Sequence, residues 1–303
     1  MKGVVRWGLP ILLIGLCLWA LDAREIAGRL ASADPLWMAL GLGALWSQTV
    51  LMALRWRLFA RYLGVELSVR RALGEYLTGQ MLNATLPGGV IGDAARAARS
   101  RDGSGGLRGA AQAVVLERAA GQVGLGVVAL AGLFVVALMP GALSLPSGLA
   151  PAVIAGSAVV AGVLGVAVLR TRLGALLRRC LPSWRVAALQ VGLSVGAALL
   201  NVAAFVACAR ATGTSMAVGP ALVLVPLILT AMLIPLSVGG WGWREGAAAA
   251  LFPLMGAAAA AGVAAGIAFG VAILLSTLPA ILFALFDGSA VGSVDARAED
   301  GAG

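Results

Sequence analysis

The sequence contains no histidine, only three cysteines and few charged residues among its 303 positions. Without histidine the chain can form neither the usual histidine-containing zinc site nor a Ser-His-Asp triad. Cys17, Cys180 and Cys208 are widely spaced, which predicts packing residues rather than a disulfide framework or a metal cluster. These absences exclude most familiar hydrolase chemistry, and no metal or cofactor is expected.

Apolar residues dominate what remains. Hydrophobic residues make up 61% of the chain, charged residues 12%, and the mean hydropathy is +0.99, far outside the range of soluble proteins. Because helices satisfy their own backbone hydrogen bonds in lipid, the composition predicts an all-α polytopic membrane protein. The net charge of +9 is then interpreted as a topology signal, and no nucleic-acid partner is expected.

Six apolar runs are long enough for the ~20 residues that a bilayer requires. They are Val4 to Leu21, Leu36 to Leu58, Ala110 to Met139, Pro151 to Leu169, Val186 to Ala209 and Ala257 to Phe286. Trp37 and Trp56 stand near the ends of the second run, where aromatic belts lie.

Two further apolar stretches are interrupted by proline and glycine pairs. The first runs from Ala72 to Ser100 around Gly88 and Gly89, and the second from Val218 to Met255 around Gly239 and Gly240. Such breaks predict two re-entrant helical hairpins in addition to the six full spans, although hydropathy would count seven or eight helices.

Positive charges fix the predicted orientation. Seventeen Lys and Arg residues, Arg55 among them, fall on one side of this layout against three on the other, which makes both termini cytoplasmic. The order span, span, hairpin, span then occurs twice, in residues 1–140 and 150–286, with opposite orientation. We therefore expect a single transmembrane domain over 1–286, built as an inverted repeat, followed by a disordered cytoplasmic tail at 287–303.

Paired interrupted helices in inverted halves indicate a transport site near the membrane midplane. The alternative is that membrane glycines merely allow helices to pack closely. The Gly262, Gly266 and Gly270 row predicts such a packing face.

Charged residues inside apolar segments are the candidate functional groups, because each costs roughly 2.5–3.5 kcal/mol to insert. They are Asp93 and Arg96 on one helical face, Glu117 and Arg118 about two turns into the third span, Arg244 and Glu245 after the second glycine pair, and Glu75 on one face with Gly79 and Asn83. The alternative is a structural role, with Asp93 paired to Arg96 and Glu117 paired to Arg244.

Six other polar residues are predicted to have structural or solvent-exposed roles rather than functional ones. Arg99, Arg101 and Arg108 are predicted to be solvated loop charges, and Gln48, Gln190 and Asn201 to form interhelical hydrogen bonds.

Three segments resemble a known family. Leu86 to Arg96, Leu116 to Arg118 and Ile234 to Gly246 are similar to the three signatures of the flippase-like family related to the transmembrane half of lysylphosphatidylglycerol synthase. The resemblance implies a bacterial inner-membrane protein that moves lipid, or lipid-linked material, between leaflets. Only a short polar tail follows Phe286 in place of an aminoacyltransferase domain, so lipid aminoacylation is not expected of this chain.

Together these observations predict a lipid flippase rather than an enzyme, acting on an anionic phospholipid or lipid-linked substrate; a homo-oligomer is left open. Helix N-termini at the breaks and arginine forks would bind a phosphate. The predicted substrate-binding residues are Arg96, Arg118, Arg244, Gly88, Gly89, Gly239 and Gly240; the predicted charge-balancing or coupling residues are Asp93, Glu117, Glu245, Glu75 and Asn83. The alternatives are an intramembrane lipid-modifying enzyme and a regulatory scaffold that transports nothing.

Overall fold

The computed structural model describes residues 15, 21–86, 89–139, 141, 143–144, 171–234 and 238–283, and these residues form helices joined by turns and loops, with no β-sheet among them. Four helices in them are long and apolar enough to cross a membrane: α3 (Pro35–Tyr62), α6 (Gly106–Leu138), α9 (Trp184–Ala211) and α12 (Ala259–Thr277), whose helical stretch continues to Phe283. The all-α polytopic membrane fold is confirmed.

The other two predicted spans, at residues 4–21 and 151–169, fall outside the described residues apart from residues 15 and 21. The inverted repeat therefore stays a prediction, since the first span of each unit lies there.

Local sequence explains where the long helices begin. α3 starts at Pro35, which needs no backbone donor at that position, and the Asp34 carboxylate accepts the N–H of Leu36. α9 follows Ser183, whose hydroxyl accepts the N–H of Val186. In each case the cap lies just before the apolar run, so hydropathy alone located these helices to within a few residues.

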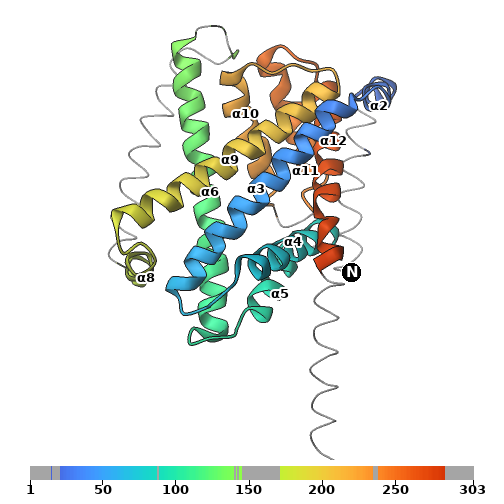
Figure 1. Ribbon diagram of the computed structural model, residues 1–303. Helices are drawn as coiled ribbons and strands as arrows, with labels where there is room; N and C mark the ends of the chain where they lie inside the picture. The colour runs from blue at the N-terminus through green and yellow to red at the C-terminus, as the bar shows by residue number, and fades with distance from the viewer. Residues whose placement is uncertain are drawn as a thin grey trace, which may run out of the picture.

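Two pairs of long helices form the centre of the molecule. α3 and α9 lie side by side, and α6 and α12 flank them (Figure 1). A Cβ added at Gly41 of α3 would lie 3.3 Å from the carbonyl oxygen of Ala204 on α9, so small residues set this close approach. Phe205, Phe252 and Phe269 pack together in the apolar core behind it.

Both interrupted stretches form helical hairpins, as predicted. The first consists of α4 (Val69–Thr85) and α5 (Ile91–Arg99); the second consists of α10 (Val218–Ala231) and α11 (Trp243–Leu251), which ends in a short 3-10 turn, η1 (Phe252–Met255). The first hairpin lies toward one end of the long helices and α10 toward the other (Figure 1). Their breaks meet, because a Cβ on Gly239 would lie 3.0 Å from the carbonyl oxygen of Ala84.

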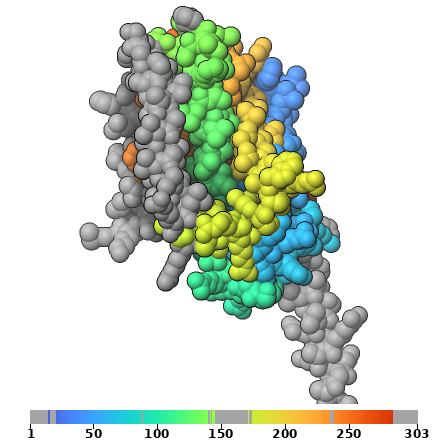
Figure 2. All heavy atoms as spheres, turned by 90° about the vertical axis from the view of Figure 1, so that its left-hand side faces the viewer, coloured from blue at the N-terminus to red at the C-terminus, as the bar shows by residue number. Residues whose placement is uncertain are grey.

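Two short amphipathic helices complete the described structure, α2 (Ala23–Ala31) and α8 (Arg172–Cys180). α8 lies across α6 rather than along it (Figure 2). Leu176 and Leu177 of α8 pack against the cluster around Trp56, and Cys180 is buried there. Cys208 is also buried, so both described cysteines pack as predicted, while Cys17 lies outside the described residues.

The structure corrects the position of one aromatic residue. Trp56 was expected in an aromatic belt because it stands near the end of a span, yet it is fully buried between α3 and the first hairpin. The helix extends beyond the predicted end to Tyr62, and the hairpin covers this part of it. Trp37 does lie near a helix end, where the guanidinium of Arg210 sits 4.7 Å from its ring.

The first hairpin depends on contact between two glycines. A Cβ at Gly92 of α5 would overlap the carbonyl oxygen of Gly79 on α4. We expect Gly92→Ala to destabilise the fold by about 1–3 kcal/mol, because the two arms must separate to accept the methyl group. Gly126→Ala in α6 is the matched control, since nothing lies within 4 Å of its Cβ position. Thermal unfolding in detergent measures both, and equal melting temperatures would contradict the contact.

Candidate functional site

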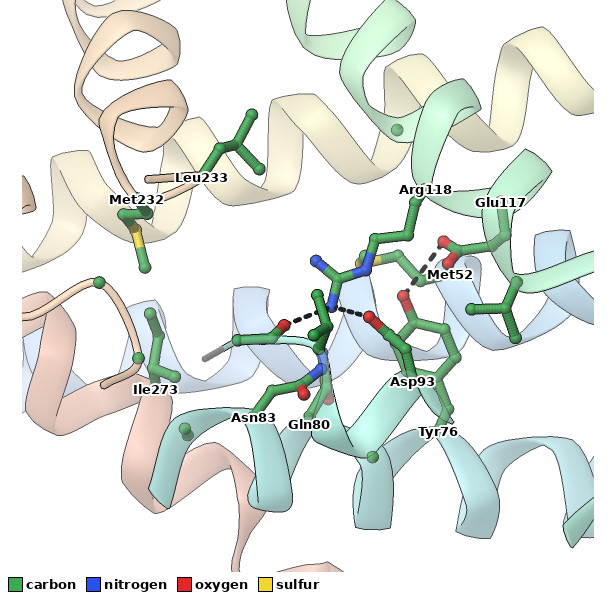
Figure 3. A pocket seen from close by; sticks show the side chains of 18 of the residues that line it. Met52, Tyr76, Gln80, Asn83, Asp93, Glu117, Arg118, Met232, Leu233 and Ile273 are labelled. Atoms are coloured by element: carbon green, nitrogen blue, oxygen red, sulfur yellow. Dashed lines mark hydrogen bonds and ion pairs between the residues drawn. The ribbon is translucent and has the colours of Figure 1, made fainter. Parts of the chain in front are cut away.

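A cavity of about 790 Å³ lies where the two hairpin breaks meet. Residues of α3, α4, α5, α6, α9, α10 and α12 line it, together with the segment between α10 and α11. Gly89 lines it from the first break, and Gly239 and Gly240 from the second; all three have positive φ, at +65°, +56° and +79°, which favours glycine. In Figure 3, Asp93, Arg118, Gln80 and Asn83 surround the polar part of the cavity, and Met232, Leu233 and Ile273 lie on the apolar part.

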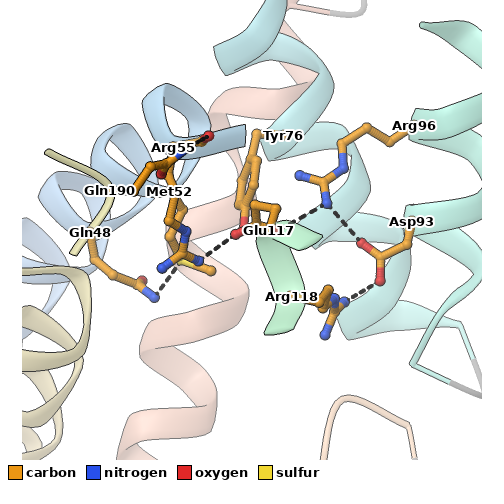
Figure 4. A network of polar contacts seen from close by, with 9 residues as sticks. All are labelled: Gln48, Met52, Arg55, Tyr76, Asp93, Arg96, Glu117, Arg118 and Gln190. Carbon is orange, nitrogen blue, oxygen red and sulfur yellow. Dashed lines mark hydrogen bonds and ion pairs between the residues drawn. The ribbon is translucent and has the colours of Figure 1, made fainter. Parts of the chain in front are cut away.

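A line of alternating charges runs along the polar wall (Figure 4). Arg55 Nη2 binds Glu117 Oε1 at 2.5 Å, and Arg96 Nη2 lies 3.3 Å from Glu117 Oε2. The same Arg96 nitrogen lies 3.2 Å from Asp93 Oδ1, while Arg118 Nη2 binds Asp93 Oδ2 at 2.5 Å. We call these five residues the charge chain: Arg55, Glu117, Arg96, Asp93 and Arg118.

Aromatic rings hold the centre of the charge chain. The Arg96 guanidinium lies 4.5 Å from the Trp56 ring and 4.4 Å from the Tyr76 ring, an arrangement in which cation–π attraction partly replaces lost hydration. The Tyr76 hydroxyl also donates to Glu117 Oε1 at 3.1 Å. Arg96 is therefore fixed from several directions and is not free to move toward a ligand.

Exposure rises steadily from one end of the charge chain to the other. The side chains of Arg55, Glu117 and Arg96 are 1–2% exposed, that of Asp93 is 14% exposed and that of Arg118 is 43% exposed. Three guanidinium groups face two carboxylates, so the charge chain carries one net positive charge. The accessible end of that charge is Arg118, which also donates to the carbonyl of Gly89 at 3.4 Å.

The two charged residues of the second hairpin pair with each other and not with the charge chain. Arg244 and Glu245 are fully buried, and Arg244 donates to Glu245 Oε1 through Nε and Nη2, with the Trp241 ring 4.7 Å away. Glu245 Oε2 accepts the N–H of Gly242 at 2.6 Å, so this carboxylate already occupies the anion position at the start of α11. Neither side chain lines the cavity.

The predicted pair of Glu117 with Arg244 is therefore wrong. Glu117 pairs with Arg55 and Arg96, while Arg244 pairs with Glu245, its neighbour in sequence. The predicted pair of Asp93 with Arg96 is confirmed. The glycine row of α12 packs against α11 as predicted: a Cβ at Gly262 or Gly270 would overlap Ala248 or Arg244, and one at Gly266 would contact Glu245.

Of the remaining predicted site residues, Asn83 lines the cavity and Glu75 does not. Asn83 lines the cavity and its Oδ1 accepts the N–H of Gly92 at 2.8 Å, which occupies one donor at the start of α5. Glu75 lies away from the cavity lining and pairs with Arg99 at 2.7 Å. Arg99 and Arg108 are exposed as predicted but belong to α5 and α6 rather than to a loop, whereas Arg101 is the predicted exposed loop charge. Gly88 lies outside the described residues.

Arg55 lines the cavity and belongs to the charge chain, although the sequence analysis did not place it among the candidate site residues. It was counted among the cytoplasmic topology charges, yet it is 1% exposed and holds Glu117. A signal was present, because Gln48 and Arg55 are seven residues apart and so share one face of α3 inside an apolar span. Two polar side chains on one face of a membrane helix indicate a polar interior rather than a helix end.

The family comparison agrees with this architecture. The sequence matches the family described as the lysylphosphatidylglycerol synthase TM region over residues 7–280. The chain belongs to this family. Membership in the lysylphosphatidylglycerol synthase transmembrane-region family, together with the apolar helices, makes it a multi-pass membrane protein related to lipid handling. No curated protein and no solved structure gives a significant match to the chain.

Proposed function

We propose that the protein is a lipid transporter that moves an anionic phospholipid, or a lipid-linked anion, between the two leaflets of a bacterial inner membrane. The observation that carries the proposal is the cavity between the hairpin breaks, with a net positive charge chain that ends on the accessible Arg118. A guanidinium group offers two parallel N–H donors, the geometry that a phosphate oxygen pair accepts.

The shape of the cavity suits a headgroup whose acyl chains stay outside. Val90, Val115 and Leu233 line it and are exposed, so an apolar rim surrounds the polar wall. The volume of about 790 Å³ lies within the range of small-molecule sites. The headgroup would enter past this rim while the acyl chains remain in the hydrocarbon.

Every charged group of the charge chain has a partner of opposite charge when no ligand is bound. Asp93 binds Arg118 in the absence of a ligand. A phosphate that reaches Arg118 competes with the Asp93 carboxylate for the same donors, and Asp93 retains Arg96 as a second partner. The exchange replaces one ion pair by another, so little uncompensated charge is exposed to the membrane interior.

Reconstituted vesicles test the proposal. Purified protein in vesicles with a fluorescent short-chain phosphatidylglycerol should make about all of the label accessible from outside, compared with about half in protein-free vesicles, and mass spectrometry should find the lipid unmodified. A modified headgroup would support an intramembrane lipid-modifying enzyme. Unchanged accessibility in vesicles with folded protein would leave a scaffold that transports nothing.

A further inference from the structure

Amide side chains line much of the polar cavity wall. They are Gln48, Gln80, Asn83, Gln122 and Asn201. The side chains of Gln122 and Asn201 form no hydrogen bond with any described residue, and the Nε2 of Gln48 has only the thioether sulfur of Met52, at 2.8 Å. Met52 lies on α3 with Gln48, so the interhelical hydrogen bonds predicted for Gln48 and Asn201 are not found among the described residues. Gln190 of α9 does bond across to α3 as predicted, since its Nε2 donates to the carbonyl of Arg55 at 3.5 Å.

Arg55 adds unused donors at the inner end of the same cavity. Its Nε and Nη1 are buried and have no partner, although its Nη2 holds Glu117. Gly121 of α6 packs against it, since a Cβ there would lie 3.0 Å from Arg55 Nη2. An orphaned guanidinium N–H inside a membrane protein is costly, and a phosphate oxygen or a hydroxyl could satisfy it.

Carboxylates, by contrast, have no free oxygen. Among the described residues that line the cavity, Asp93 and Glu117 are the acidic ones. Both oxygens of Asp93 bind arginines, and both oxygens of Glu117 bind arginines, one of them also accepting from Tyr76. A positively charged headgroup would therefore compete with arginine for either carboxylate, because Glu117 keeps Arg55 and Arg96, and Asp93 keeps Arg96 even where a phosphate takes Arg118.

We infer that the cavity selects a phosphodiester headgroup that bears hydroxyl groups and no cationic group, such as a glycerol or sugar phosphate. This inference rests on the proposed function and names its substrate class. The monoanionic phosphodiester matches the single net positive charge of the charge chain. Hydroxyl groups both donate and accept, so they complement amide groups, which also do both. An aminoacylated headgroup fits poorly, because its ammonium group would lie among the arginines.

Binding of four lipids with identical short acyl chains tests the inference on the purified full chain in detergent. Phosphatidylglycerol has the phosphodiester and two hydroxyls, phosphatidylmethanol has the same charge without hydroxyls, and phosphatidylcholine and an aminoacylated phosphatidylglycerol add a cation. We expect phosphatidylglycerol to bind about threefold to tenfold more tightly than phosphatidylmethanol, the effect of one or two hydrogen bonds, and at least tenfold more tightly than either cationic lipid.

Substitutions of two amide side chains test whether these side chains cause the preference for phosphatidylglycerol over phosphatidylmethanol. Gln122→Met and Asn201→Leu break no hydrogen bond among the described residues, so both should melt near the wild-type temperature. Each should lower phosphatidylglycerol affinity about threefold and leave phosphatidylmethanol affinity unchanged. Gln112→Met is the control, because Gln112 lies on the same helix as Gln122 but lines a different pocket, beside Arg108 and Arg179.

The outcomes separate the inference from the proposed function. Equal or tighter binding of the aminoacylated lipid, no binding of any of the four, or an unchanged preference in both amide variants would overturn the inference. Preferential binding of phosphatidylglycerol that both amide variants abolish supports it, even where vesicles show no lipid movement. That last combination would reject transport and retain a hydroxylated anionic lipid as the bound ligand.

Discussion

Glu117→Gln is expected to lower the free energy of unfolding by about 3–5 kcal/mol, the usual cost of removing one partner from a buried ionic network. Glu117 is fully buried and is the common partner of Arg55 and Arg96. Without its charge, Arg55 keeps no carboxylate among the described residues, and the two guanidinium groups repel each other in a medium of low dielectric. Thermal and denaturant unfolding in detergent measure the effect.

Paired substitutions show whether the cost comes from the lost ion pair. Glu117→Gln combined with Arg55→Gln should recover a large part of the lost stability, because Arg96 still has Asp93. Glu75→Gln is the matched control: its partner Arg99 is 40% exposed, so its loss should cost no more than about 1 kcal/mol. No recovery in the double variant would mean that Arg55 and Glu117 do not depend on each other.

Arg244 and Glu117, by contrast, are not expected to be energetically coupled. Arg244 is satisfied by Glu245 on the second hairpin. In a double-mutant cycle we expect Glu117 and Arg244 to be additive within about 0.5 kcal/mol, because they share no partner. Glu245 and Arg244 should instead be strongly coupled, since they form their own buried pair.

Local features of the fold could be predicted from the sequence because their causes are local. Each of these features lies within one short stretch of the chain. They are the apolar runs of α3, α6, α9 and α12, the glycine pairs at the two breaks, and the i,i+3 partners Asp93 and Arg96. The cavity between the breaks follows from the same reasoning, since both breaks contribute glycines to its lining.

Partners distant in sequence could not be predicted this way. Arg55 and Glu117 are 62 residues apart, and they meet only because the first hairpin and α6 pack against the end of α3. Counting arginines by side of the membrane treats every arginine near a span end as solvated, which is why Arg55 was misassigned. In the same way, assigning an aromatic residue near a span end to the aromatic belt misplaced Trp56, the ring that contacts Arg96. Tyr76 carried no signal in the sequence, because a single tyrosine in an apolar helix is ordinarily a packing residue.

Arg118→Gln is expected to separate transport from stability. Arg118 is 43% exposed and is the outermost member of the charge chain, so its pair with Asp93 should contribute no more than about 1 kcal/mol to folding. A phosphate bound at Arg118, however, loses an ionic hydrogen bond of about 1.5–3 kcal/mol in the variant, which weakens lipid binding about tenfold to a hundredfold. Lipid binding, lipid movement in vesicles and melting temperature should be measured on the same preparation.

Two further substitutions give this comparison its controls. Arg108→Gln removes an exposed charge from the same helix but outside the cavity, so it should leave anionic-lipid binding and movement near wild type. Arg118→Lys keeps the charge but not the two parallel donors, and should retain only part of the affinity. Wild-type binding and movement in Arg118→Gln would place the headgroup elsewhere, and a large loss of melting temperature in that variant would show that Arg118 supports the fold. The expected combination of weak binding, slow movement and an unchanged fold assigns the accessible end of the charge chain to the ligand, because Arg55 and Arg96 are buried and are held by Glu117, whereas Arg118 is exposed to the cavity.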